Sequence, residues 1–107
     1  MKPVPLTRGE IQRIIETPGI KVVSSSFVLL CQLSSEIRLS VLVGKKIGKA
    51  VSRNRVRRRL KEAYRLTSGF PSGHYIIMGR NPALSSSFDQ LLEQMVQARR
   101  TLARLKA

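Results

Sequence analysis

The residues best able to do chemistry in this sequence are ten cationic side chains gathered in one segment. Half of the chain's 20 lysines and arginines lie between positions 45 and 66, with a single acid, Glu62, among them. The ten are Lys45, Lys46, Lys49, Arg53, Arg55, Arg57, Arg58, Arg59, Lys61 and Arg65. A guanidinium group donates a planar pair of hydrogen bonds that matches phosphate oxygens, and it also stacks on exposed bases. The segment therefore predicts a surface that binds the phosphates of a nucleic acid.

Repulsion within this segment argues against a purely structural role. On a helix, cations four residues apart, such as Arg55 and Arg59, repel each other by about 0.2–0.5 kcal/mol per pair. Bound phosphates would neutralise that face and release counterions. The whole chain carries 20 basic and 6 acidic residues, a formal net charge of +14, which also favours an anionic partner. A membrane surface is disfavoured because the apolar stripe of the segment is narrow and contains no Trp or Phe.

The carboxylates do not form the pattern expected of a nuclease. Catalytic Mg²⁺ is held by clustered carboxylates, whereas the six acids of this chain are scattered over several predicted elements. They are Glu10, Glu16, Glu36, Glu62, Asp89 and Glu93. His74 stands alone before a predicted strand, and a structural role is favoured for it. We therefore expect no catalytic residue, and no metal or cofactor bound by the protein alone.

The single cysteine and the hydropathy pattern bear on the compartment. Cys31 is the only cysteine, so an internal disulfide is impossible, and we expect a small buried thiol in a strand. The longest nearly apolar stretch, 27–33, is far too short to span a bilayer, and positions 1–6 do not begin a signal peptide. These features predict a cytoplasmic protein that does not act at a membrane.

Local signals place the cationic segment within an α+β chain. Thr7-x-x-Glu10 predicts a capping box for a short helix that ends at Thr17-Pro18-Gly19. Residues 21–33 read as extended with a break at 24–26, and alternation over 37–43 predicts another strand. A strand over 74–78 precedes a helix capped by Ser87-x-x-Gln90. The order predicts one domain, residues 1–107, with helices packed on a small sheet.

The cationic segment itself is predicted to be a helix of about five turns over 49–67, because no breaker interrupts it. At 100° per residue, four apolar side chains fall within one narrow wedge, and this wedge is the expected buried stripe. Its members are Val56, Leu60, Ala63 and Tyr64. Arg53 falls at the edge of the wedge, close to where the helix meets its support.

The stretch from Lys45 to Tyr64, KKIGKAVSRNRVRRRLKEAY, resembles the signature segment of the bacterial ribonuclease P protein component. In that family a K-K-x-G-x-A-V-x-R-N-R-x-[KR]-R stretch follows a strand and opens the central helix. The flanks agree, with Phe27-Val28-Leu29 in one strand and Gly79-Arg80 after another. The resemblance covers nearly the whole chain and adds Asn54 to the expected RNA-binding residues.

The resemblance implies a two-layer α-β sandwich in αβββαβα order, with a left-handed βαβ crossover through the basic helix. It implies the catalytic RNA of ribonuclease P as partner, precursor tRNA as substrate, and hydrolysis by Mg²⁺ at the RNA active site, with no small-molecule substrate. A small ribosomal protein remains an alternative on composition, and DNA binding is a weaker one. The DNA-binding alternative would also use the basic helix.

The resemblance further implies a cleft between the sheet and the first helix that holds the single-stranded 5′ leader. The positions that best match the aromatic residues of the family's cleft hold Ile11, Ile15 and Leu30. Phe27 is the remaining aromatic there, with a core position as an equal alternative. Because base stacking on aromatics contributes about 1–3 kcal/mol per base, we expect this protein to hold a leader more by shape and charge.

Overall fold

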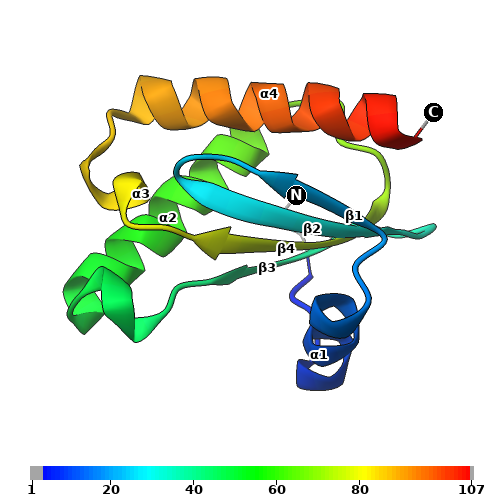
Figure 1. Ribbon diagram of the computed structural model, residues 1–107, viewed down its shortest axis with the longest axis horizontal. Helices are drawn as coiled ribbons and strands as arrows, with labels where there is room; N and C mark the ends of the chain where they lie inside the picture. The colour runs from blue at the N-terminus through cyan, green and yellow to red at the C-terminus, as the bar shows by residue number, and fades with distance from the viewer. Residues whose placement is uncertain (1–3, 107) are drawn as a thin grey trace.

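The computed structural model describes residues 4–106, and its elements follow the expected order (Figure 1). In chain order they are α1 (Arg8–Glu16), β1 (Ile20–Val23), β2 (Phe27–Leu33), β3 (Arg38–Leu42), the 3-10 turn η1 (Lys45–Ile47), α2 (Ala50–Leu66), β4 (Gly73–Gly79), α3 (Pro82–Ser85) and α4 (Phe88–Lys106). The short helix α3 was not predicted. Pro82 is the first residue of α3, where its missing N–H has no helical partner to lose.

Both predicted capping boxes are present. At α1, the Thr7 hydroxyl accepts from the Glu10 N–H at 3.2 Å, and the Glu10 carboxylate accepts from the Thr7 N–H at 2.8 Å. At α4, the Ser87 hydroxyl accepts from the Gln90 N–H at 3.2 Å, and the Gln90 side chain accepts from the Ser87 N–H at 3.0 Å. These reciprocal bonds satisfy N–H groups that a helix start leaves free, so both helices begin where the sequence predicts.

The sheet combines antiparallel and parallel pairing. Its strand order is β1-β2-β4-β3, with β1, β2 and β4 antiparallel in turn and β3 parallel to β4. A parallel pair needs a crossover connection, which α2 supplies. The segment before α1 extends the β3 edge, where Val4 bridges Arg38 and the Leu39 N–H donates to the Val4 carbonyl at 3.0 Å. The expected α-β sandwich is confirmed.

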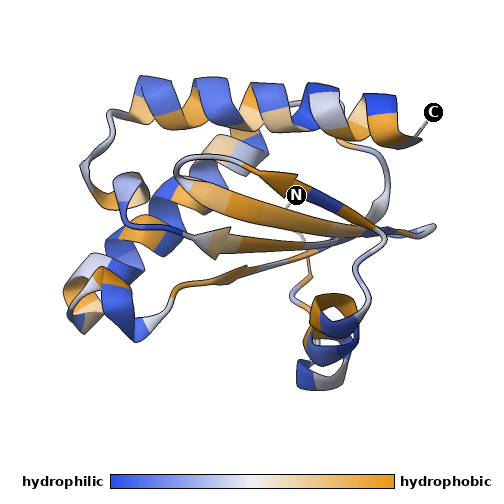
Figure 2. Cartoon of the chain, in the orientation of Figure 1, coloured by the Kyte–Doolittle hydropathy of each residue, from blue (hydrophilic) through white to orange (hydrophobic). Residues whose placement is uncertain are grey.

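The main core lies between the sheet and the layer formed by α2 and α4. Side chains alternate along β2 and β4, so one set packs against the two helices and the other faces the opposite side. The first set includes Leu29, Cys31 and Tyr75, which cluster with the apolar stripe of α2 and with Leu91 of α4. Figure 2 shows this arrangement as orange strands beneath helices whose outward surfaces are blue.

Four buried residues of α2 match the predicted stripe: Val56, Leu60, Ala63 and Tyr64. Close approach to the sheet is possible because β4 ends in a glycine. A Cβ at Gly79 would lie 3.0 Å from Cγ1 of Val56, tighter than ordinary packing allows. At the other end of α2, the Tyr64 ring stacks on Phe70 with centroids 4.6 Å apart. The helix is therefore held on the core at both ends.

Helix α1 packs on the other face of the sheet. A smaller cluster there joins Leu6 and Ile14 to Leu30 and Ile76, the alternate residues of β2 and β4. Figure 1 shows α1 on the side of the sheet opposite to α4. Because α1 is short, it covers only part of this face.

Candidate nucleic-acid interface

The exposed surface of η1 and α2 presents six cations that make no hydrogen bond or ion pair within residues 4–106. They are Lys45, Lys46, Lys49, Arg55, Arg58 and Lys61, and Asn54 is exposed among them. Their helix is anchored by the buried stripe on its opposite side, so their positions do not depend on a flexible loop. The structure therefore gathers more than half of the predicted cations on one accessible surface, which we call the basic face.

The start of α2 adds partial positive charge to the basic face. Its N-cap residue is Lys49, which makes no side-chain cap, and the first turn contains no acid. The first N–H groups of the helix therefore lack the side-chain acceptor that Thr7 provides for α1. Free N–H groups at a helix start bind phosphate oxygens and carry the positive end of the helix dipole. Sequence reasoning missed this feature, although a lysine at an N-cap was a readable signal.

A substitution at this N-cap should separate stability from binding. Lys49→Asp is expected to stabilise the fold by about 1 kcal/mol, because an aspartate at this extended position caps the helix and complements its dipole. The same change should weaken RNA binding at least as much as Lys49→Ala, which removes the charge and adds no cap. Urea unfolding and filter binding measure the two effects. Tighter RNA binding by Lys49→Asp would show that phosphates do not approach this helix start.

Three further cations of the helix have local partners and remain near the surface. Arg53 donates from Nη1 to the Gly48 carbonyl at 3.1 Å, and Arg57 donates from Nη1 to Oδ1 of Asn54 at 2.7 Å. Arg65 pairs with Glu62, which resolves which arginine this lone acid reaches. Each guanidinium has five N–H donors, so one local contact leaves others for phosphate.

The structure corrects the prediction for Arg59. Its Nη1 donates to the carbonyls of Ala83 at 2.9 Å and Leu84 at 3.1 Å, and its Nη2 donates to the carbonyl of Ser86. Burial, and then repulsion from Arg55, lowers the pKa of this guanidinium. Arg59 therefore attaches α3 to α2 and is occupied within the protein. Its partners lie 24 to 27 residues away, which a helical wheel cannot show.

Arg59→Ala is expected to act on stability. Removing a charged donor from three backbone carbonyls should lower the free energy of unfolding by about 2 kcal/mol. RNA affinity of the folded variant should change less than about threefold, because the side chain does not face the partner. Denaturant unfolding and RNA titration below the unfolding transition test both parts. Unchanged stability together with weaker RNA binding would mean that Arg59 binds RNA and does not hold α3 on α2.

The second predicted site lies on the face of the sheet that carries α1. Four apolar residues, one from each strand, align there across the register: Val23, Val28, Met78 and Leu42. We call them the apolar row. Val23 is 62% exposed and the other three are half-buried, with Ile11 of α1 packed against the same cluster. Ile15 on α1 is 42% exposed. These residues form an accessible apolar strip beside α1.

Two of the predicted leader-cleft residues are placed differently. Phe27 is fully buried and belongs to the core beneath α2 and α4, because it shares the parity of Leu29 and Cys31 on β2. It cannot contact a ligand beside α1, and that prediction is wrong. Leu30 lies on the correct face but is 3% exposed and belongs to the same buried cluster as Ile14. The accessible members of the apolar row were missed because they are neighbours only through the strand register.

An ion-pair cluster fixes α1 on this face of the sheet. Arg38 of β3 donates from Nη1 to Oε2 of Glu10 at 2.5 Å and from Nη2 to the Pro5 carbonyl at 2.7 Å. Hydrogen bonds from Thr7, above all from its backbone N–H, lower the pKa of the Glu10 carboxyl, and Arg38 acts in the same direction. Nearby, His74 Nε2 lies 3.1 Å from Oε1 of Glu36. Two of the acids and the lone histidine thus have structural partners.

Within residues 4–106, no three His, Cys, Asp or Glu side chains come close enough together to hold a metal ion. None of the helices in this part of the chain combines the length and apolarity required to cross a bilayer. Cys31 is buried and unpaired with another cysteine, as predicted, and burial raises the pKa of its thiol.

The fold and the basic face define a small α+β protein whose central helix presents a set of exposed cations. A family model described as Ribonuclease P matches residues 6–103, and the chain belongs to this family. The Ribonuclease P protein component of Brucella suis is 49% identical over 61 residues, which is 54% of this chain and 43% of that protein. That of Thermus thermophilus is 37% identical over 67 residues, 63% of this chain and 40% of its own length. The chain thus spans less than half of these two relatives.

Solved structures agree with the fold. The RNase P protein of Staphylococcus aureus superposes with a TM-score of 0.78 at 23% identity, covering 98% of this chain and 97% of that one. The RNase P protein of Thermotoga maritima gives a TM-score of 0.78 at 24% identity, covering 90% of this chain and 96% of that one. The α+β architecture predicted from the sequence is therefore that of known RNase P proteins.

Proposed function

We propose that this protein is the protein subunit of ribonuclease P, the ribonucleoprotein endonuclease that removes the 5′ leader of precursor tRNA. In this proposal the basic face binds the catalytic RNA. The observation that carries it is the set of six exposed cations, without partners within residues 4–106, on the segment that resembles the family signature. Family membership favours this function over the alternative of a small ribosomal protein.

In this proposal the RNA carries out the chemistry and the protein contributes binding. Mg²⁺ at the RNA active site hydrolyses the phosphodiester, and the protein alone binds no cofactor and no small-molecule substrate. Cations that neutralise phosphates replace condensed counterions, so the protein should lower the Mg²⁺ concentration that the RNA requires. We also propose that the complex works in the cytoplasm, away from membranes, which the free thiol of Cys31 supports.

We further propose that the apolar row, with Ile11 and Ile15, contacts the 5′ leader of precursor tRNA. The strip is accessible, and the end of β3 that contributes Leu42 leads directly into Lys45 and Lys46 of η1. Apolar side chains can support bases while neighbouring lysines hold the backbone. Because the strip contains no aromatic residue, its contribution per base should be smaller than the roughly 1–3 kcal/mol of aromatic stacking.

Reconstitution tests the proposal. The protein is mixed with the catalytic RNA from the same genome and precursor tRNA, at a Mg²⁺ concentration where the RNA alone is slow. We expect faster cleavage at the mature 5′ end, and absence of stimulation would contradict the proposed function. Precursors that differ only in leader length test the leader contact, since the protein should tighten binding only when a leader is present. A ribosomal protein would instead co-sediment with ribosomal subunits and leave cleavage unchanged.

A further inference from the structure

A cavity of about 550 Å³ lies beside α2, between that helix, the edge strand β3 and the segment before α1. Its lining residues are Pro5, Leu39, Arg58, Lys61, Glu62, Tyr64 and Arg65. The volume is within the roughly 300–1,000 Å³ that is typical of small-molecule sites, so a nucleoside can enter it. The cavity is separate from the apolar row, because Leu39 belongs to the core cluster under α2 and not to the cluster under α1.

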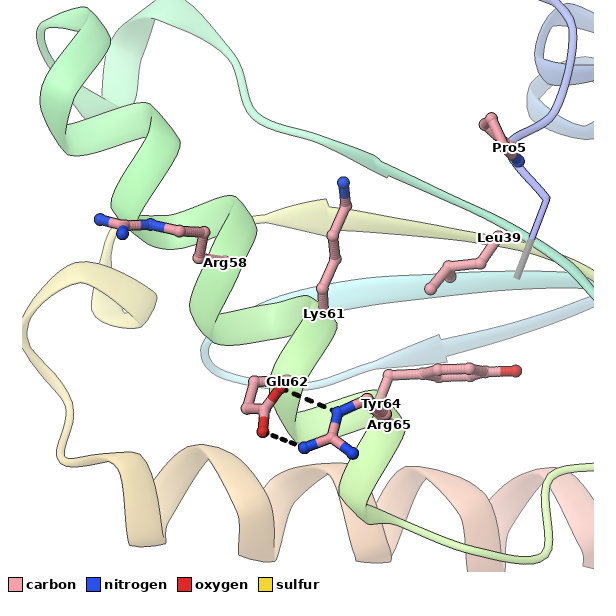
Figure 3. Close-up of a pocket in the computed structure, with 7 residues that line it drawn as sticks. All are labelled: Pro5, Leu39, Arg58, Lys61, Glu62, Tyr64 and Arg65. Atoms are coloured by element: carbon pink, nitrogen blue, oxygen red, sulfur yellow. Dashed lines mark hydrogen bonds and ion pairs between the residues drawn. The ribbon is translucent and has the colours of Figure 1, made fainter. Parts of the chain in front are cut away.

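The cavity has an apolar interior and a cationic rim. Pro5, Leu39 and the Tyr64 ring supply the interior, as Figure 3 shows. The rim residues lie at positions 58, 61, 62 and 65, a spacing that places them on one face of α2. In the same view Lys61 extends from the side of α2 that faces Leu39 and Pro5, whereas the guanidinium of Arg58 points away from them. The aliphatic stems of the cations add apolar surface below their charged ends.

The charges of the rim favour an anion. Glu62 is already paired, since Oε2 accepts from Nε of Arg65 at 3.0 Å and Oε1 accepts from Nη2 of the same residue. Arg58 and Lys61 are exposed and have no partner within residues 4–106. Three cations and one carboxylate leave a net charge of +2 around an apolar interior. This combination complements a nucleotide, whose base is flat and weakly polar and whose phosphate is negative.

We propose that this cavity is a base-binding pocket that takes one unpaired nucleotide of the catalytic RNA, with its phosphate at Lys61. The inference rests on the proposed function and adds a subsite to it. The catalytic RNA is the occupant because the rim belongs to the same helix as the basic face. A paired base cannot enter, so the nucleotide must come from a loop or bulge, where bases are free to leave the stack.

Filling the pocket tests the inference without removing a charge. Leu39→Phe should weaken binding of the catalytic RNA about tenfold, the low end of what one stacked base contributes, while the salt dependence of binding stays unchanged. Pro5→Phe fills the pocket from an exposed position. It replaces Leu39→Phe in the binding assay if Leu39→Phe lowers the melting temperature. Leu105→Phe, at an exposed leucine on α4, is the matched control and should bind as wild type.

Chemical probing of the RNA identifies the occupant. At saturating protein, one unpaired base of the catalytic RNA should be protected by wild type and Leu105→Phe, and reactive with Leu39→Phe. Equal affinity and equal protection for all variants would overturn the inference. A change confined to nucleotides of precursor tRNA would also overturn it. Cleavage stimulation by wild type tests the proposed function separately, so the two can fail independently.

Discussion

Replacing Lys45, Lys46 and Arg55 together with glutamine is expected to weaken binding of the catalytic RNA about 100-fold near 0.15 M salt. Each lost phosphate contact reduces the magnitude of the slope of log K against log salt by about 0.7–0.9. At this salt concentration, the loss of three contacts lowers the binding constant by about two factors of ten. The fold should be unaffected, because all three side chains are exposed and have no partner within residues 4–106. None of the three lines the cavity beside Leu39, so the base-binding pocket stays intact.

The matched control removes the same charge elsewhere. Glutamine at Arg99, Arg100 and Arg104 on α4 also lowers the net charge by three. If binding is localised on the basic face, this control should lose less than about fivefold and keep nearly the full salt slope. Titrations of labelled RNA across a salt series measure both quantities. Equal losses for the two triple variants would mean that the protein is held by its general charge and that α2 has no special part.

Leu60→Ala is expected to lower the free energy of unfolding by about 2–5 kcal/mol. Leu60 is fully buried at the centre of the α2 stripe, and its Cδ1 would lie 3.4 Å from a Cβ built at Gly79. Truncation loses the transfer free energy of the removed methyl groups and leaves a cavity that the tightly packed strand cannot close. For a domain of this size such a loss is a large share of the total stability.

The comparison with an exposed leucine of the same helix isolates burial. Leu66 is 50% exposed at the last turn of α2, and Leu66→Ala should change stability by less than about 0.5 kcal/mol. Both variants should bind RNA with near wild-type affinity at temperatures where they are folded, since neither contributes a cation. Denaturant unfolding checks the first expectation and titration the second. A large loss for both leucines would mean that the end of α2 is more tightly packed than its exposure indicates.

The two pairs of variants together separate the two sides of α2. The glutamine variants should change RNA binding at constant stability, and Leu60→Ala should change stability at constant binding. This separation is possible because the buried stripe consists of only four residues, and the other side chains of the helix are partly or fully exposed. A helix with so narrow a buried side is positioned by its packing on the sheet. The cations on its exposed side are therefore presented from a fixed support.

Much of the local structure could be predicted because it depends on residues a few positions apart. The capping boxes at Thr7 and Ser87, the break at 24–26 and the four-residue stripe of α2 all rest on contacts or periodicities within one or two turns. The basic face follows from the same helical period. The sequence by itself therefore determined which segments form elements and which side of α2 is buried.

Contacts between distant segments were decided only by the tertiary structure. The face on which Phe27 lies depends on the register of β2, the role of Arg59 on the docking of α3, and the apolar row on the alignment of four strands. The pocket beside Leu39 exists because residues near positions 5, 39 and 61 meet across a strand edge. Side-chain alternation allows two faces for every strand, and only the packing of α1, α2 and α4 selects between them.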